Sequence, residues 1–147
     1  MGELIRRAIP ADIPRLVELG EEFANLSQLY HKFSVSREMI IWSTNQMVQN
    51  NDVVVLVLEV DGVIQGVIAG VLQKIFFSED VALQELVWYV KNGFKGTELL
   101  KAFEVIAIGI GCQALIVGNK PAYCDLGKYY ERQGFTFLEN QYTKRLV

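Results

Sequence analysis

The feature that most constrains the fold of this chain is a valine-rich run followed at once by a turn signal. Residues 51–60 are dense in valine and leucine, which is typical of a strand buried on both faces or nearly so. Asp61-Gly62 comes next, and this dipeptide suits the two-residue turn of a β-hairpin. The apolar run at 63–75 then predicts the returning strand. The centre of the chain is therefore predicted to be a hairpin.

Helices and strands are predicted on both sides of this hairpin. Apolar residues at helical spacing predict helices over about 12–26 and 97–110, one that begins at Ser36, and a short one that ends before Gly134. Further strands are predicted at 3–9, 82–90, 113–118 and, as a pair, after Gly134. The order β-α-α-β-β-β-α-β-α-β-β predicts an α/β fold, in which a mixed, mostly antiparallel sheet of about seven strands is flanked by about four helices.

Composition limits the class of protein. The 147 residues are 51% hydrophobic and 21% charged, which predicts a single globular domain over 1–147. The net charge of −3 argues against a general nucleic-acid binder. Cys112 and Cys124 form neither a CxxC pair nor a cluster with histidine, so no metal site is predicted and a reducing, cytoplasmic location fits best. No apolar run approaches the roughly 20 residues of a membrane helix.

The last fifth of the chain carries the strongest functional signal. Tyr129 and Tyr130 stand a few residues before Gly134-Phe135, and Tyr142-Thr-Lys144 lies near the end. This segment, together with the order of elements, resembles the GNAT superfamily of acetyl-CoA-dependent N-acetyltransferases, and most closely its small single-domain phage and bacterial members. The resemblance implies an acyl-CoA-dependent N-acyltransferase that moves an acetyl group from acetyl-CoA to a primary amine by direct attack.

The resemblance also implies two catalytic residues. Tyr130 stands four residues before Gly134 and would protonate the departing thiolate, with Tyr129 as its alternative. Glu85, inside an apolar strand, would accept the proton of the amine. Burial of such a carboxylate raises its pKa toward the range useful for a general base.

The cosubstrate acetyl-CoA would be bound by residues of three segments. The resemblance places these cofactor contacts at the end of the strand over 82–90, in the turn that opens the next helix, and after the strand over 113–118: Trp88, Tyr89, Val90, Lys95, Gly96, Thr97 and Asn119. Backbone N–H groups at the start of a helix suit a pyrophosphate. The match in the turn is partial, because no second glycine follows Gly96.

The acceptor side is less defined by the sequence. The loop over 27–35 holds Tyr30 and His31, which are predicted to line the pocket of a small-molecule or protein amine. Two alternatives stay open. The short turn at Gly96 also suits a GNAT-fold binding protein without catalysis, and the valine-rich strands or the C-terminal pair also suit a homodimer.

Overall fold

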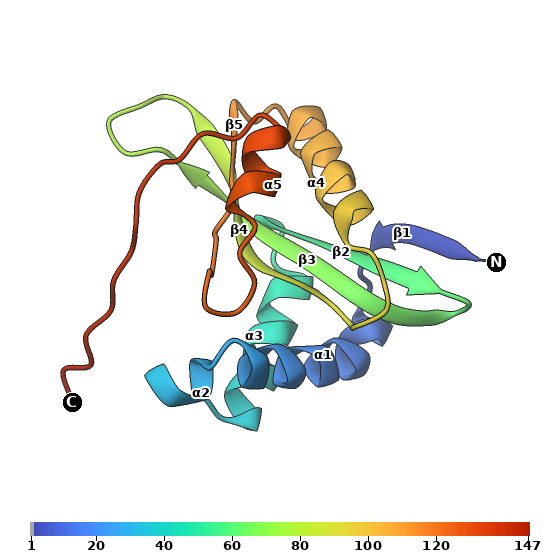
Figure 1. Ribbon diagram of the computed structural model, residues 1–147. Helices are drawn as coiled ribbons and strands as arrows, with labels where there is room; N and C mark the ends of the chain where they lie inside the picture. Colours follow the sequence, from blue (N-terminus) through green and yellow to red (C-terminus); the bar gives the residue numbers. More distant parts are fainter. Residues whose placement is uncertain (1) are drawn as a thin grey trace.

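The computed structural model describes residues 2–147 and contains one mixed sheet between two groups of helices (Figure 1). The strands are β1 (Glu3–Arg7), β2 (Val53–Val60), β3 (Val63–Lys74), β4 (Val81–Val90) and β5 (Ala114–Ile116). The helices are α1 (Ile13–Leu26), α2 (Leu29–Lys32), α3 (Arg37–Gln49), α4 (Thr97–Ile110) and α5 (Gly127–Arg132), with a 3-10 turn over Pro10–Asp12.

The sheet follows the order β1-β2-β3-β4-β5, in which β4 and β5 are parallel and the other neighbours antiparallel. The predicted hairpin at Asp61-Gly62 joins β2 to β3. Both turn residues have positive φ, 50° and 83°, which the tight hairpin turn requires and which Asp and Gly tolerate.

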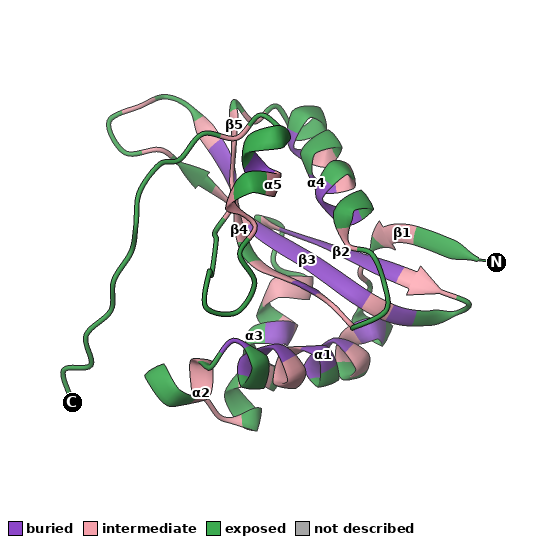
Figure 2. Ribbon diagram, in the orientation of Figure 1, coloured by how far each residue is buried: buried purple, intermediate pink, exposed green. Residues whose placement is uncertain are grey.

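Each face of the sheet is covered by its own helices. On one face, Phe103 and Leu99 of α4 and Tyr130 of α5 pack with Ile68 and Leu83 of the sheet. On the other face, a second core holds residues of α1 together with inward-facing residues of β2, β3 and β4: Leu16, Leu19, Phe23, Val55, Val57, Ile64, Val67, Ala69 and Tyr89. Figure 2 shows both layers as buried stripes on the central strands and on the facing sides of α1 and α4.

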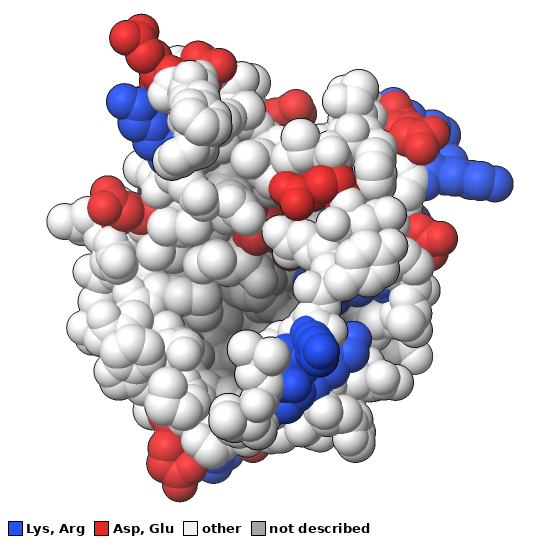
Figure 3. All heavy atoms as spheres, turned by 90° about the vertical axis from the view of Figure 1, so that its left-hand side faces the viewer, with Lys and Arg blue, Asp and Glu red and all other residues white. Residues whose placement is uncertain are grey.

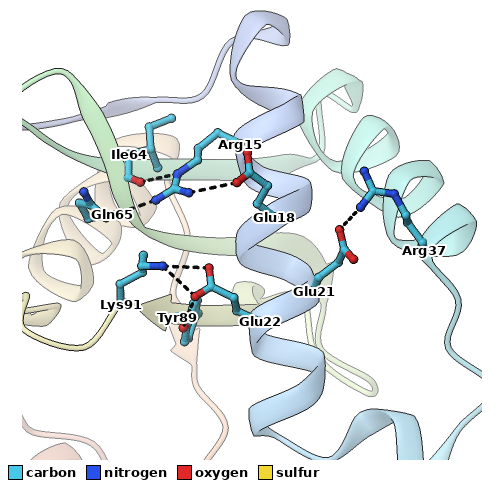
Figure 4. A network of polar contacts seen from close by, with 9 residues as sticks. All are labelled: Arg15, Glu18, Glu21, Glu22, Arg37, Ile64, Gln65, Tyr89 and Lys91. Carbon is cyan, nitrogen blue, oxygen red and sulfur yellow. Dashed lines mark hydrogen bonds and ion pairs between the residues drawn. The ribbon is translucent and has the colours of Figure 1, made fainter.

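Ion pairs fix α1 against the sheet and against α3 (Figure 4). Lys91, just after β4, donates to Glu22 of α1 at 2.9 Å. Arg15 Nε donates to the carbonyl of Ile64 at 2.9 Å, and Arg37 of α3 pairs with Glu21. The acidic face of α1 is therefore neutralised by its neighbours.

Strand β4 changes its partners along its length. Its first residues pair with β3 on one side and, over Ala82–Gln84, with β5 on the other. At Glu85 the register with β3 shifts: Gly70 lies opposite Glu85 and Ala69 opposite Val87, so one residue bulges out. Beyond this bulge β5 no longer pairs with β4, and the two strands leave an opening.

The sequence predicts two strands after Gly134, and this prediction is wrong. Residues 135–147 have no regular structure and run from α5 along the outside of the molecule (Figure 1). Phe135 still packs against Tyr130, but the large apolar side chains after it are exposed, Phe137 at 74% and Tyr142 at 91%. Because a strand needs a hydrogen-bonding partner, alternating residues alone do not make one. The sheet of the described residues thus has five strands instead of about seven.

Other differences are smaller. The predicted loop over 27–35 contains the four-residue helix α2, so the described residues form five α-helices instead of about four. Ser36 caps α3 as predicted, since its hydroxyl accepts from the Met39 N–H at 3.2 Å. Gly111 ends α4 with a φ of 98°, also as predicted.

Within residues 2–147, none of the helices has both the length and the hydropathy to cross a membrane.

Candidate active site

A cavity of about 330 Å³ lies where β4 and β5 separate. Its wall combines residues of α1, β4, the start of α4, the β5–α5 loop and α5: Phe23, Glu85, Trp88, Val90, Gly96, Thr97, Gly118, Lys120, Tyr123, Cys124, Leu126, Tyr129 and Tyr130. We call the part at Gly96 and Thr97 the α4 end, and the part at Phe23, Lys120 and Tyr123 the loop end. Glu85 and Tyr130 belong to the same wall.

Glu85 lies in the cavity wall just before the bulge in β4. Its side chain lies on the face that carries α4 and α5, and its Oε1 accepts the backbone N–H of Gly118 at 2.9 Å. Burial raises the pKa of the Glu85 carboxyl, while the Gly118 N–H and the charge of Lys120 act in the opposite direction. A carboxylate whose pKa is raised is a stronger base than an ordinary one, which suits it to accept a proton.

Tyr130 lies in the same wall with its phenol held in place. It is only 6% exposed, and its hydroxyl donates to the Gly118 carbonyl at 3.0 Å. Burial, and next the nearby Glu85, raise the pKa of the Tyr130 hydroxyl, so it stays protonated at pH 7. Its neighbour Tyr129 also lines the cavity, with the two ring centroids 6.2 Å apart.

Gly118 therefore joins the two residues that carry the predicted proton transfers. The Gly118 N–H donates to the carboxylate of Glu85, and the Gly118 carbonyl accepts the hydroxyl of Tyr130. The arrangement brings a proton acceptor and a proton donor to one cavity, which suits a reaction that removes one proton and supplies another.

The α4 end has room and donors for a ligand. The Trp88 indole N–H is buried and has no hydrogen-bond partner among the described residues, which is costly unless a ligand supplies an acceptor. A Cβ on Gly96 would lie 2.7 Å from Val90 Cγ2 and 3.1 Å from Trp88 Nε1, so any larger residue would force its neighbours to shift. No side chain caps the first turn of α4, in which the Leu99 N–H donates to the Gly96 carbonyl at 3.1 Å. The N–H groups of Thr97 and Glu98 suit an anion, and the Glu98 side chain is paired with Lys101 at 3.3 Å.

The cavity wall contains six of the predicted site residues: Glu85, Tyr130, Trp88, Val90, Gly96 and Thr97. Others lie elsewhere. Tyr89 packs on the opposite face near Glu22, and the Asn119 amide is engaged by Asp125 and the Leu126 N–H. Lys95, Tyr30 and His31 do not line the cavity either, and their roles stay predictions.

Several wall residues were not predicted from the sequence. Phe23 reads as an ordinary core residue of α1, and Gly118 as the end of a strand. Lys120 and Tyr123 belong to a loop that carries no motif in the sequence. The loop folds back on itself, since the N–H groups of Tyr123 and Cys124 both donate to the carbonyl of Lys120.

Comparisons with known proteins give a likeness of structure only. No family model and no curated protein matches the sequence. The structure resembles the aminoglycoside acetyltransferase AAC(6')-Iy, solved with a CoA-containing bisubstrate analogue, with a TM-score of 0.80, 13% identity and coverage of 100% of this chain and 99% of that chain.

Two further similar structures come from named bacteria. A GNAT family acetyltransferase of Staphylococcus aureus has a TM-score of 0.72 and 16% identity, with 99% of this chain and 100% of that chain covered. A ribosomal-protein-alanine N-acetyltransferase of Brucella melitensis has a TM-score of 0.76 and 16% identity, again with 99% and 100% covered. The likeness spans nearly the whole of each chain, and the fold of this protein is that of the GNAT acetyltransferases.

Proposed function

We propose that this protein is an N-acetyltransferase that transfers the acetyl group of acetyl-CoA to a primary amine. The observation that carries the proposal is the meeting of Glu85 and Tyr130 at Gly118, inside the cavity between β4 and β5. The fold supports it, because solved proteins of this fold carry CoA compounds.

The α4 end fits the cofactor. The first turn of α4 offers backbone N–H groups to a pyrophosphate, Gly96 leaves space beside them, and the Trp88 N–H offers a further donor. Beyond the bulge, the side of β4 that faces away from β3 has no pairing with β5, so it can accept an extended pantetheine arm as a strand accepts a neighbour. Lys95 and Asn119 keep their predicted cofactor roles as part of this proposal.

The chain's own residues would then act as follows. Glu85 accepts the proton of the attacking amine, directly or through water, and Tyr130 donates its proton to the departing sulfur. A C–N bond forms as the C–S bond breaks, and the products are an N-acetyl amine and free CoA thiol. Holding both reactants in one cavity removes much of the entropic cost of their encounter.

Two measurements test this function. We expect acetyl-CoA to bind in calorimetry, and a thiol reagent to report CoA release that depends on an added amine. Heat of binding without any amine-dependent release would leave a binding protein of the same fold, which is the second candidate. The absence of binding at millimolar acetyl-CoA would refute the proposed function.

A further inference from the structure

The loop end of the cavity carries one charged side chain, and that charge is positive. Figure 3 shows a hollow in the surface on the left-hand side of Figure 1, with Lys and Arg side chains gathered at its lower edge and Asp and Glu side chains above it. Within the cavity wall the charged residues are Glu85 and Lys120. Glu85 already accepts the Gly118 N–H and is proposed to accept the proton of the amine, so Lys120 is the charge left to bind an acceptor.

Lys120 has no anionic partner of its own in the described part of the chain, where the ion pairs involve other residues. Its Nζ lies 5.8 Å from the centre of the Phe23 ring, a cation–π distance. The other acid of its loop, Asp125, accepts from Asn119 and from the Gly127 N–H, and it does not line the cavity. A carboxylate on a ligand would therefore meet an ammonium whose only acidic neighbour in the wall, Glu85, acts on it without forming an ion pair.

Aromatic rings form the remaining surface at this end. Phe23 and Tyr123 meet edge to face with centroids 6.0 Å apart, and Phe23 also contacts Tyr89 at 6.1 Å. The rings of Phe23 and Tyr123 present an apolar wall beside the ammonium of Lys120. A planar or branched apolar group fits such a wall better than a chain of hydroxyls and amines does.

Nearby carboxylates are already neutralised, which argues against a polycationic acceptor. The acidic residues of α1, the helix that supplies Phe23, are each paired: Glu18 with Arg15, Glu21 with Arg37 and Glu22 with Lys91 (Figure 4). A polyamine or aminoglycoside needs several free carboxylates. Here it would meet Lys120 and a single carboxylate that is already hydrogen-bonded.

We propose that the acceptor is a small amine that carries both a carboxylate and an apolar or aromatic side chain, as an α-amino acid does. This inference rests on the proposed function. Lys120 would bind the carboxylate, Phe23 and Tyr123 would pack against the side chain, and the amine would point toward Glu85. In the reaction the amine nitrogen bonds to the acetyl carbon, the thioester C–S bond breaks, one amine proton passes to Glu85, and the thiolate takes a proton from Tyr130.

The test compares matched acceptors in a thiol-release assay with acetyl-CoA. L-phenylalanine is expected to give a kcat/KM about tenfold or more above those of spermidine and kanamycin, since a hydrogen bond to a charged group is worth at least that factor. Lys120→Met should lower kcat/KM for L-phenylalanine about tenfold, yet change that for L-phenylalaninamide less than about twofold, because the amide lacks the carboxylate. Lys74→Met, at the far end of β3, is the control and should change neither.

L-phenylalaninamide also distinguishes two roles of Lys120, binding the carboxylate of the acceptor and lowering the pKa of Glu85. If Lys120 acts only by lowering the pKa of Glu85, Lys120→Met will impair both acceptors equally, and the inference fails. A clear preference for spermidine or kanamycin also overturns it, as does acetyl-CoA binding without acetylation of L-phenylalanine. In these cases the proposed function stands if spermidine, kanamycin or another amine releases CoA thiol. Acetyl-CoA binding without release by any amine would instead leave the binding protein. If the native protein does not bind acetyl-CoA at all, both the inference about the acceptor and the proposed function are refuted.

Discussion

Two corners of this molecule each hold a carboxylate away from solvent, and the two carboxylates have very different hydrogen-bond partners. Near the start of the chain, Asp12 receives two hydrogen bonds from Arg6, at 2.8 and 3.1 Å, and a third from the Ile9 N–H. Between β4 and β5, Glu85 receives one backbone N–H and no ion pair within the described chain. The first carboxylate is held as an anion, and the second is not.

The difference shows in the direction of the two pKa values. The hydrogen bond from Arg6, which outweighs burial, lowers the pKa of Asp12, whereas burial raises that of Glu85. A compensated carboxylate contributes stability. An uncompensated one costs stability and becomes available for proton transfer. Asp12 therefore belongs to a site that stabilises the fold, whereas Glu85 belongs to the candidate active site, and mutations at each position can test this difference.

The largest effect is expected for Asp12→Asn. Removing one partner of a buried pair leaves Arg6 undercompensated, although Glu59 still pairs with it at 3.1 Å. The free energy of unfolding at pH 7, measured with urea, should fall by about 3 kcal/mol. Because the pKa of Asp12 is lowered in the folded state, this contribution is present above about pH 4 and disappears as pH falls through the folded pKa.

Glu18→Gln provides the matched control for that measurement. Glu18 pairs with Arg15 at 3.4 Å, but its side chain is 62% exposed. Its loss should change stability by less than about 0.5 kcal/mol. A difference between Asp12→Asn and the native protein that does not shrink as pH falls below about 4 would contradict the assignment to the ionised carboxylate.

Glu85→Gln should lower activity and not stability. The amide is close in shape and its oxygen can still accept the Gly118 N–H, but it cannot take a proton. Turnover with acetyl-CoA and an amine should fall about 100-fold. The free energy of unfolding at pH 7 should stay the same or rise, because a neutral group is easier to bury than a charged one. A stability loss like that of Asp12→Asn would show that Glu85 also stabilises the fold, and the proposed difference between the two carboxylates would be wrong.

The pH dependence of Glu85 should have the opposite sign to that of Asp12. Its folded pKa lies above the ordinary 4.5, so its stabilising contribution is present below that value and is lost as pH rises through the folded pKa. The kcat/KM should rise about tenfold per pH unit up to the same pKa. In Glu85→Gln this rise of kcat/KM with pH should vanish. A rise that remained would show that another group titrates.

Tyr130→Phe should have a smaller effect on turnover, about tenfold. A thiol with a pKa near 8.5 leaves readily as a thiolate, so it needs less help from an acid than an amine needs from a base. Acetyl-CoA affinity by calorimetry should be unchanged. Tyr142→Phe, in a residue that is 91% exposed, is the control. Full turnover in Tyr130→Phe would exclude Tyr130 as the acid.

The smallest effect is expected for Gly96→Ala. The added Cβ would lie 2.7 Å from Val90 Cγ2, so the α4 end must shift, and acetyl-CoA affinity should fall about fivefold. Gly109→Ala is the control in the same helix, because nothing lies within 4 Å of its added Cβ. It should leave affinity unchanged and stabilise the protein by up to about 1 kcal/mol. Equal acetyl-CoA affinities in Gly96→Ala and Gly109→Ala would show that Gly96 does not contribute to cofactor binding.

Local chemistry was predictable because it depends on neighbours in the chain. The Asp61-Gly62 hairpin, the Ser36 cap and the Gly111 helix end follow from the conformations that these residue types prefer, and the structure has all three. The C-terminal strands were not predictable in this way. Their alternating residues fit a strand, but only a partner strand would make one.

The sequence by itself determined the order of the elements as far as α5, apart from the short α2, together with the central hairpin. It also marked Glu85 as a carboxylate in an apolar strand and Tyr130 by its spacing to Gly134. Tertiary structure alone decided that both meet at Gly118, and that Phe23 and Lys120, 97 positions apart, form one end of the cavity. The physical reason is that a bulge and a strand separation are set by packing between distant segments. Spacing along the chain carries no record of that packing.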